Sequence, residues 1–313
     1  MKANIDTITL STNLRYYDLD VIKRYFNPGK EGNNRVYYYN ERGFKYKYYH
    51  YCKGILVNTL HITLSPEKLI GEQLSDTTYK QFENAYNKRI YQLFNFIYPL
   101  ELQKLNRIDY KIDYYTEHKD IYIKLLQKTT KEYNHLKRKK NYNSSLYLSS
   151  KSRNINIYDR EQYCIDKHKS IDEIEKYKNI IRYEVQIKKN KIYNNLKNWG
   201  LIDCLFNYVN IYDMNYFIDD VLSPIIYKGN YYNQYHSNKI IQEHYTDYIT
   251  LQLIELQKDI SIFGVSNTRN KYSPYQFSKY IKLLQNININ PIPIPKGDNI
   301  RYLENPINYI FAT

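Results

Sequence analysis

Alternation of apolar and polar residues at every second position is the feature that most constrains how this chain can fold. It is clearest in three segments, 107–114, 154–160 and 180–188. Side chains of a β-strand point alternately to its two faces, so each segment predicts a strand with one apolar and one polar face. Antiparallel sheets that cover a core on one side and leave the other open show this pattern. The sequence therefore predicts an antiparallel sheet with one polar face.

The same order of predicted strands and helices occurs twice along the chain. The first half reads as a strand, a helix, three strands and a helix, at 5–11, 18–26, 36–40, 44–51, 54–64 and 76–97. The second half follows the same order, at 107–114, 119–131, 144–150, 154–160, 180–188 and 191–199. This repeat predicts an α+β fold with a pseudo-duplicated antiparallel sheet and helices packed on one face. We expect one domain over 1–200, built from two βαβββα-like halves of about 1–100 and 101–200.

Beyond Gly200 the alternating pattern stops, and helical periodicity predicts a helical C-terminal region over 201–313. Its clearest helix is 273–285, which begins with a capping serine and a proline at the first helical position. A helix-turn-helix over 259–286 is one interpretation, with Lys279 and Lys282 off the apolar stripe as DNA contacts. A helix of an ordinary bundle is equally consistent with the pattern.

The net charge of +14, from 46 Lys and Arg against 32 Asp and Glu, favours a polyanionic partner. Each phosphate contact releases counterions, so nucleic acid is the natural partner of such a chain. The abundance of Tyr, Ile, Asn and Lys is typical of AT-rich coding DNA and accounts for part of the charge. The charge alone therefore supports nucleic acid only weakly.

Cysteine usage and hydropathy point to the cytoplasm. Cys52, Cys164 and Cys204 are three in number and form no CxxC or zinc-ligand spacing, which predicts a reducing compartment without structural disulfides. The N-terminus becomes polar too soon for a signal peptide. No run approaches the roughly 18 apolar residues that a membrane helix needs, so no membrane partner is expected.

The polar faces of the three alternating segments carry residues suited to phosphoryl transfer. They present Arg107, Asp109, Lys111 and Asp113, then Asn156, Tyr158 and Arg160, then Arg182, Glu184, Gln186 and Lys188. If the strands are neighbours, these side chains converge. Carboxylates such as Asp109, Asp113 and Glu184 are hard ligands suited to Mg²⁺ or Mn²⁺, and nearby cations stabilise transition-state charge.

Tyr158 is the candidate nucleophile of this set. A tyrosine hydroxyl has a pKa of about 10, so it needs a nearby metal or cation to attack at neutral pH. The competing interpretation is structural, because half-exposed strands usually carry charges that only solvate one face. With 40 tyrosines in the chain, alternation alone cannot choose Tyr158, and Tyr163 and Tyr147 remain alternatives.

Other motifs exclude several chemistries. The seven histidines form no HxH or HExxH pair, which disfavours a conjugative relaxase with a histidine metal site. No GxGxxG or Walker loop is present, so nucleotide hydrolysis is not expected. The basic run 137–140 (KRKK) predicts a solvated loop that could contact backbone phosphate.

Five short motifs occur in one consistent order over about residues 4–200. They are IDTITL at 5–10, HITLSPEKLIG at 61–71, NRID at 106–109, the SR-x(4)-Y spacing from Ser152 to Tyr158, and IRYEVQIK at 181–188. Together they resemble the phage and plasmid replication initiators of the filamentous-phage gene II/X type, which are rolling-circle nicking enzymes. The resemblance implies that Tyr158 is the nucleophile and that Asp109 and Glu184 bind the metal. Asp113 is closer to the R-I-D-x-x-x-D form of related plasmid initiators.

The resemblance implies a replication initiator that nicks one strand of a double-stranded origin in a bacterial cytoplasm. It would hold the 5′-phosphate on Tyr158, leave a 3′-hydroxyl for a host polymerase, and later rejoin the displaced single strand; a host helicase is a further expected partner. The predicted DNA contacts are Arg107, Lys111, Lys151, Arg153, Arg160, Arg182, Lys188, Lys279 and Lys282. The alternative is a DNA-binding replication regulator without catalysis.

Overall fold

The computed structural model describes residues 3–32, 34–52, 55–129, 132–133, 135–142, 144–200 and 202–310. The alternating segments are strands, and so are several segments that lack clear alternation. The strands of the first half are β1 Asn4–Asn13, β2 Asn27–Glu31, β3 Asn34–Glu41, β4 Phe44–Cys52 and β5 Ile55–Leu64. Those of the second half are β6 Lys104–Tyr115, β7 Glu132–Tyr133, β8 Leu136–Tyr142, β9 Ser145–Ser149, β10 Arg153–Asp159 and β11 Ile180–Lys188.

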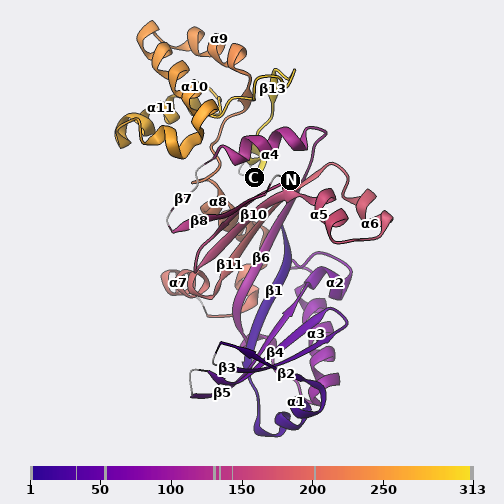
Figure 1. Ribbon diagram of the computed structural model, residues 1–313. Helices are drawn as coiled ribbons and strands as arrows, with labels where there is room; N and C mark the ends of the chain where they lie inside the picture. The colour runs from indigo at the N-terminus through magenta and orange to yellow at the C-terminus, as the bar shows by residue number, and fades with distance from the viewer. Residues whose placement is uncertain are drawn as a thin grey trace.

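Within the described residues these strands form one antiparallel sheet of 11 strands (Figure 1). Its order is β2-β3-β4-β5-β1-β6-β11-β10-β9-β8-β7. In each half the last strand lies beside the first, β5 beside β1 and β11 beside β6, and the others follow outward in reverse order. The two first strands, β1 and β6, pair with each other where the halves meet. The predicted α+β class and the pseudo-duplicated sheet are therefore confirmed.

Two of the strands correct the sequence prediction. β2 contains Pro28 and Gly29 and was not among the predicted strands. It is the outermost strand of its half, and an edge strand tolerates a proline because one side of it needs no N–H donor. The KRKK run was expected to be a loop, but it lies in β8, where Arg138 donates to the carbonyl of Gln127 at 3.0 Å.

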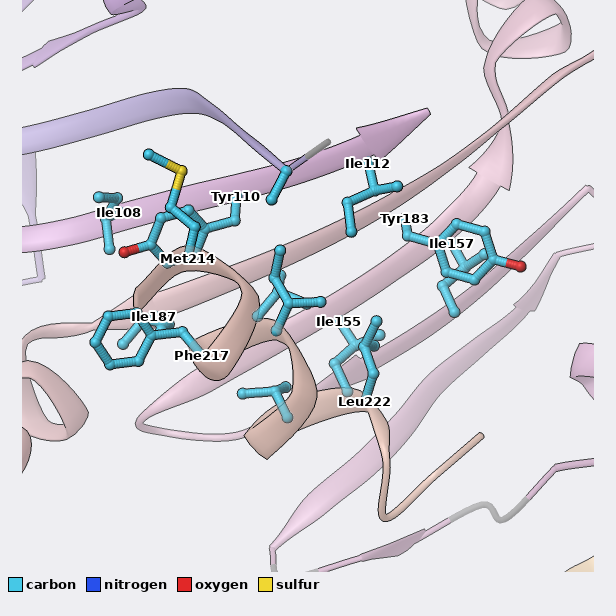
Figure 2. Packing of buried hydrophobic residues seen from close by; sticks show 14 of the residues in the cluster. Ile108, Tyr110, Ile112, Ile155, Ile157, Tyr183, Ile187, Met214, Phe217 and Leu222 are labelled. Atoms are coloured by element: carbon cyan, nitrogen blue, oxygen red, sulfur yellow. The ribbon is translucent and has the colours of Figure 1, made fainter. Parts of the chain in front are cut away.

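Helices cover the apolar face of the sheet. They include α3 Tyr79–Phe94, α4 Lys119–Gln127, α7 Lys189–Trp199 and α8 Ile211–Leu222, and they share one core cluster with the strands. Figure 2 shows Met214, Phe217 and Leu222 of α8 close to Ile187, Tyr110 and Ile155 of the sheet. Phe217 stacks on Tyr110 with ring centres 5.8 Å apart. Packing of the sheet therefore continues past residue 200, where the first domain was expected to end.

Short helices lie around the first half and beside the polar face. They are α1 Leu19–Tyr25, α2 Pro66–Ile70, α5 Arg160–Asp166 and α6 Ile171–Lys176. Residues of α2, α5 and α6 line a cavity on the polar face. That face is consequently bordered by helices, where the sequence had predicted helices on one side alone.

The C-terminal region is mainly helical, as predicted. Besides α8 it contains α9 Gln234–His244, α10 Asp247–Arg269, α11 Pro274–Asn286 and α12 Ile307–Ile310. Of these, α9, α10 and α11 lie together at one end of the molecule (Figure 1). The short pair β12 Tyr231–Tyr232 and β13 Tyr302–Leu303 was not expected. Ser273 caps α11, accepting from the backbone N–H of Gln276 at 3.2 Å. A DNA-reading role for α11 stays a prediction.

Two further observations concern the cysteines and the hydropathy of the helices. Of the described cysteine side chains, those of Cys164 and Cys204 are free thiols; the side chain of Cys52 lies outside the described residues. No helix in the described part of the chain is long and apolar enough to span a bilayer.

Candidate active site

The sequence left open whether β6, β11 and β10 are neighbours. They lie side by side, so their polar faces form one continuous surface. The register sets the neighbours across this surface. Tyr158 is opposite Arg182, and Arg182 is opposite Asp113. The next rows are Asn156, Glu184 and Lys111, and then Asn154, Gln186 and Asp109.

A cavity of about 690 Å³ opens on this surface, and we call it the charged cavity. Tyr158, Asp109 and Glu184 all line it, so the structure brings these predicted residues together. Asp113 is absent from the lining. Its carboxylate is exposed and takes two bonds from the guanidinium of Arg182, both at 2.7 Å. It lies four positions along the strand from Asp109, roughly 13 Å away.

Tyr158 is 7 % exposed, and its hydroxyl donates to Oε2 of Glu184 at 3.3 Å. Its ring centre lies 5.3 Å from that of Tyr163. Burial raises the pKa of the Tyr158 hydroxyl, and the Glu184 carboxylate raises it further, while the guanidinium groups of Arg182 and Arg160 oppose the rise. Tyr158 is therefore protonated at neutral pH, and its attack requires a proton acceptor and additional positive charge.

Glu184 is suited to accept that proton. Burial, then the carboxylates of Asp109 and Asp6, raise its pKa to about 7, against the opposing charge of Arg182. Glu184 forms no ion pair with any described residue, in contrast to the other carboxylates around it. A carboxyl group that titrates near neutral pH beside a tyrosine hydroxyl is a frequent feature of acid–base sites.

Asp109 is 1 % exposed and is held by a neighbour on its own strand. The Nε atom of Arg107 donates to its two oxygens at 2.8 and 3.1 Å. Burial raises the pKa of Asp109, and the Arg107 ion pair only partly offsets that rise. Arg107, predicted as a DNA contact, thus also neutralises a predicted metal ligand.

Asp6 is a residue of the charged cavity that sequence reasoning missed. Strict alternation along β1 would place Asp6 on the same face as Ile8. However, Asp6 and Thr7 together oppose the single residue Asp109, so a β-bulge shifts the register and both Ile5 and Ile8 are buried. The three-residue spacing of these isoleucines was the available signal. Burial works against ionisation of Asp6, but Lys111 and Arg182 hold its pKa below the usual value.

Three cations of the cavity differ in how they are paired. Lys111 and Arg182 are buried and paired, Lys111 with Glu67 at 2.6 Å and Arg182 with Asp113. Arg160 has no ion pair in the described part of the chain, and it lies over the rings of Tyr163 and Tyr177, at 4.8 and 4.5 Å.

Arg160 was expected on the polar face of a strand. It is instead the first residue of α5, because the Asp159 carboxylate accepts from the backbone N–H of Gln162 at 3.0 Å and caps the helix.

The remaining predicted DNA contacts lie away from the cavity lining. Lys188 donates to the carbonyl of Ser150 and to Oδ1 of Asn154, at 2.8 and 2.7 Å. Lys151 is exposed and Arg153 half-buried, both at the β9–β10 turn. Lys279 and Lys282 are exposed on α11. Their contact with DNA stays a prediction.

Two carboxylates of the charged cavity are candidate ligands for a divalent metal. Among the described residues no three His, Cys, Asp or Glu side chains are grouped closely enough to hold an ion alone. Mg²⁺, however, is usually bound by one or two carboxylates, with phosphate oxygens and water completing its shell. The carboxylate of Asp109 is one cause of the raised pKa of Glu184, so the two groups lie close enough to interact. These two carboxylates are the donors that suit Mg²⁺ or Mn²⁺.

Comparison with known proteins adds no relative: no protein-family model matches the chain, and a search of curated proteins finds no significant match. The likeness to phage and plasmid initiators consequently rests on the short motifs alone.

Proposed function

We propose that this chain is a metal-dependent DNA-nicking and strand-transfer enzyme that initiates rolling-circle replication with Tyr158 as its nucleophile. The hydrogen bond from Tyr158 to Glu184, inside a cavity that also contains Asp109 and several cations, is the observation that carries the proposal. A tyrosine placed only for packing would not need a carboxyl group of raised pKa at its hydroxyl.

The nicking step follows from these positions. Oε2 of Glu184 accepts the phenolic proton as Oη of Tyr158 bonds to the scissile phosphorus. The bond from phosphorus to the 3′-oxygen breaks, and that oxygen takes a proton from solvent water to leave as a 3′-hydroxyl. A bound Mg²⁺ or Mn²⁺ supplies positive charge that polarises the phosphodiester and favours the phenolate. Arg182 and Arg160 contribute charge to the same transition state.

The product keeps the energy of the broken bond. The DNA strand remains attached as a 5′-phosphotyrosine, so another 3′-hydroxyl can attack the phosphorus and reverse the reaction. This chemistry suits a protein that opens a double-stranded origin and later rejoins the displaced single strand. The free 3′-hydroxyl would serve a host polymerase, with a host helicase as a further partner.

The test is a nicking assay on supercoiled plasmids that carry fragments of the DNA encoding the chain. With Mg²⁺, wild type is expected to convert one such plasmid to the open circular form, and Tyr158→Phe is expected to leave it supercoiled. Tyr193→Phe, at an exposed tyrosine of α7, is the matched control and should nick like wild type. Equal nicking by Tyr158→Phe and wild type would refute Tyr158 as the nucleophile.

One observation favours the alternative, a DNA-binding replication regulator without catalysis. The ion pair with Arg107 occupies Asp109, so a single free carboxylate remains beside Tyr158. If the chain is such a regulator, wild type and Tyr158→Phe should bind the same plasmid equally, and neither should nick it.

A further inference from the structure

The polar face changes its chemical character at β10. Toward β11, Tyr158 and Asn156 are opposite the charged residues Arg182 and Glu184. Toward β9, the same two residues are opposite Ser145 and Tyr147, which carry no charge at neutral pH. Tyr158 thus stands on the border between a charged and an uncharged part of the face.

A second cavity, of about 420 Å³, lies on the uncharged side, and we call it the neutral cavity. Tyr158 and Tyr163 line both cavities, so the two spaces meet at the candidate nucleophile. Ser145, Tyr147 and Asn156 are also in its lining. The volume is within the range of about 300–1,000 Å³ that small-ligand pockets occupy.

The charged groups of the neutral cavity are largely engaged by the protein itself. Asp159 is paired with Lys119 at 2.9 Å and caps α5, and Asp166 accepts from the side-chain amide of Gln162 at 2.8 Å. Lys167 is the one cation among the described lining residues. A phosphate would therefore be drawn to the charged cavity, where the arginines lie.

Among the side chains left available in the neutral cavity are aromatic rings and one amide. Tyr163 is 38 % exposed, and the guanidinium of Arg160 over its ring fixes its position. Tyr147 is half-buried on β9. Asn156 makes no side-chain hydrogen bond with any residue that the structure describes, so its donor and acceptor are both open. Aromatic rings stack on nucleobases, and an amide pairs with base edges.

We propose that the neutral cavity binds an unstacked nucleobase of single-stranded DNA, belonging to the nucleotide next to the phosphate that Tyr158 attacks. The proposal rests on the proposed function, because it names how that site selects its substrate. Asn156 reads the base edge, while Tyr147 and Tyr163 provide the stacking surfaces. The two tyrosines that were alternative nucleophiles thus acquire a binding role.

The experiment measures binding by fluorescence polarisation and requires no strand cleavage. The full-length chain with Tyr158→Phe and Mg²⁺ is titrated into labelled single-stranded oligo-dA, oligo-dC and oligo-dT. We expect unequal affinities for the three oligonucleotides. Asn156→Ala should bring the affinities together, and Asn156→Asp, which removes the amide donor, should move the preference toward cytosine, whose amino group a carboxylate accepts.

The stacking role is tested by a second pair of variants. Tyr147→Ala should weaken binding of all three oligonucleotides about tenfold, in keeping with the loss of one stacked base. Tyr147→Phe keeps the ring and should retain most of the binding, which separates lost stacking from lost structure. Tyr193→Ala is the control at an exposed tyrosine outside both cavities and should bind like its parent.

Equal affinities of the parent protein for the three oligonucleotides would overturn the nucleobase site. So would a base preference that persists in Asn156→Ala while Tyr147→Ala binds as tightly as its parent. These outcomes are independent of nicking. An active enzyme without base preference refutes the base site alone. A protein with base preference but no nicking activity refutes the proposed function alone.

Discussion

Replacing Glu184 with glutamine is expected to make the protein more stable at pH 8 and to remove a pH dependence of its stability. Glu184 is shielded from water and lies near the carboxylates of Asp109 and Asp6, and its pKa rises from 4.5 to about 7. That difference corresponds to about 3 kcal/mol of folding free energy. Glutamine has nearly the same shape and carries no charge to bury.

The direction follows from which state binds the extra proton. Below pH 4.5 Glu184 is protonated in the folded and the unfolded chain, so its contribution to stability is fully present. Between pH 4.5 and about 7 the unfolded chain ionises while the folded protein keeps its proton, so stability falls as pH rises. Above about pH 7 the loss is complete.

The assay is urea unfolding at a series of pH values from 4.5 to 8, in EDTA, followed by the fluorescence of Trp199. The free energy of unfolding of wild type should fall relative to that of Glu184→Gln by about 3 kcal/mol across this range. Glu101→Gln changes an exposed glutamate and should stay parallel to wild type. Parallel curves for wild type and Glu184→Gln would refute the clustering of carboxylates described above.

Three further predictions concern the metal and the packing. Mg²⁺ at about 100 times its dissociation constant should stabilise wild type by about 2.7 kcal/mol in thermal unfolding, and Glu184→Gln should lose most of this; equal stabilisation would contradict Glu184 as a ligand. Phe217→Ala should lower the free energy of unfolding by about 3–5 kcal/mol because α8 covers the sheet through this ring, whereas a loss under about 1 kcal/mol would contradict that packing. Gly229→Ala should cost about 1–3 kcal/mol or more in urea unfolding, since φ is +90° and a Cβ would lie 2.5 Å from the Ile289 carbonyl carbon; a neutral result would contradict this close approach.

The sequence predicted the parts of the fold that follow from the alternation of apolar and polar residues along the strands. Alternation at 107–114, 154–160 and 180–188 identified β6, β10 and β11, because a half-covered strand must alternate. It also placed Asp109, Tyr158 and Glu184 on one face, and the register brings all three to one cavity.

The features that the sequence did not predict arise where the two-residue alternation of a strand is locally interrupted. Asp6 lines the cavity because a β-bulge interrupts β1 at this residue. The bulge breaks the alternation from which the face of Asp6 could have been predicted. Arg160 left the strand because Asp159 caps a helix there, a signal carried by one side chain. Asp113 was grouped with Asp109 only because both lie on one face of the strand. In the structure Asp113 lies farther along the strand and forms an ion pair with Arg182, outside the cavity lining.

The central claim is that Tyr158 bonds covalently to DNA, and peptide mapping of a trapped adduct tests it most directly. The DNA fragment that wild type nicks is incubated with the protein and Mg²⁺, and the denatured product is digested with nuclease and protease and analysed by mass spectrometry. We predict a nucleotide attached to the peptide that contains Tyr158, and no adduct with Tyr158→Phe. An adduct on Tyr147 or Tyr163, or one that persists in Tyr158→Phe, would contradict the account.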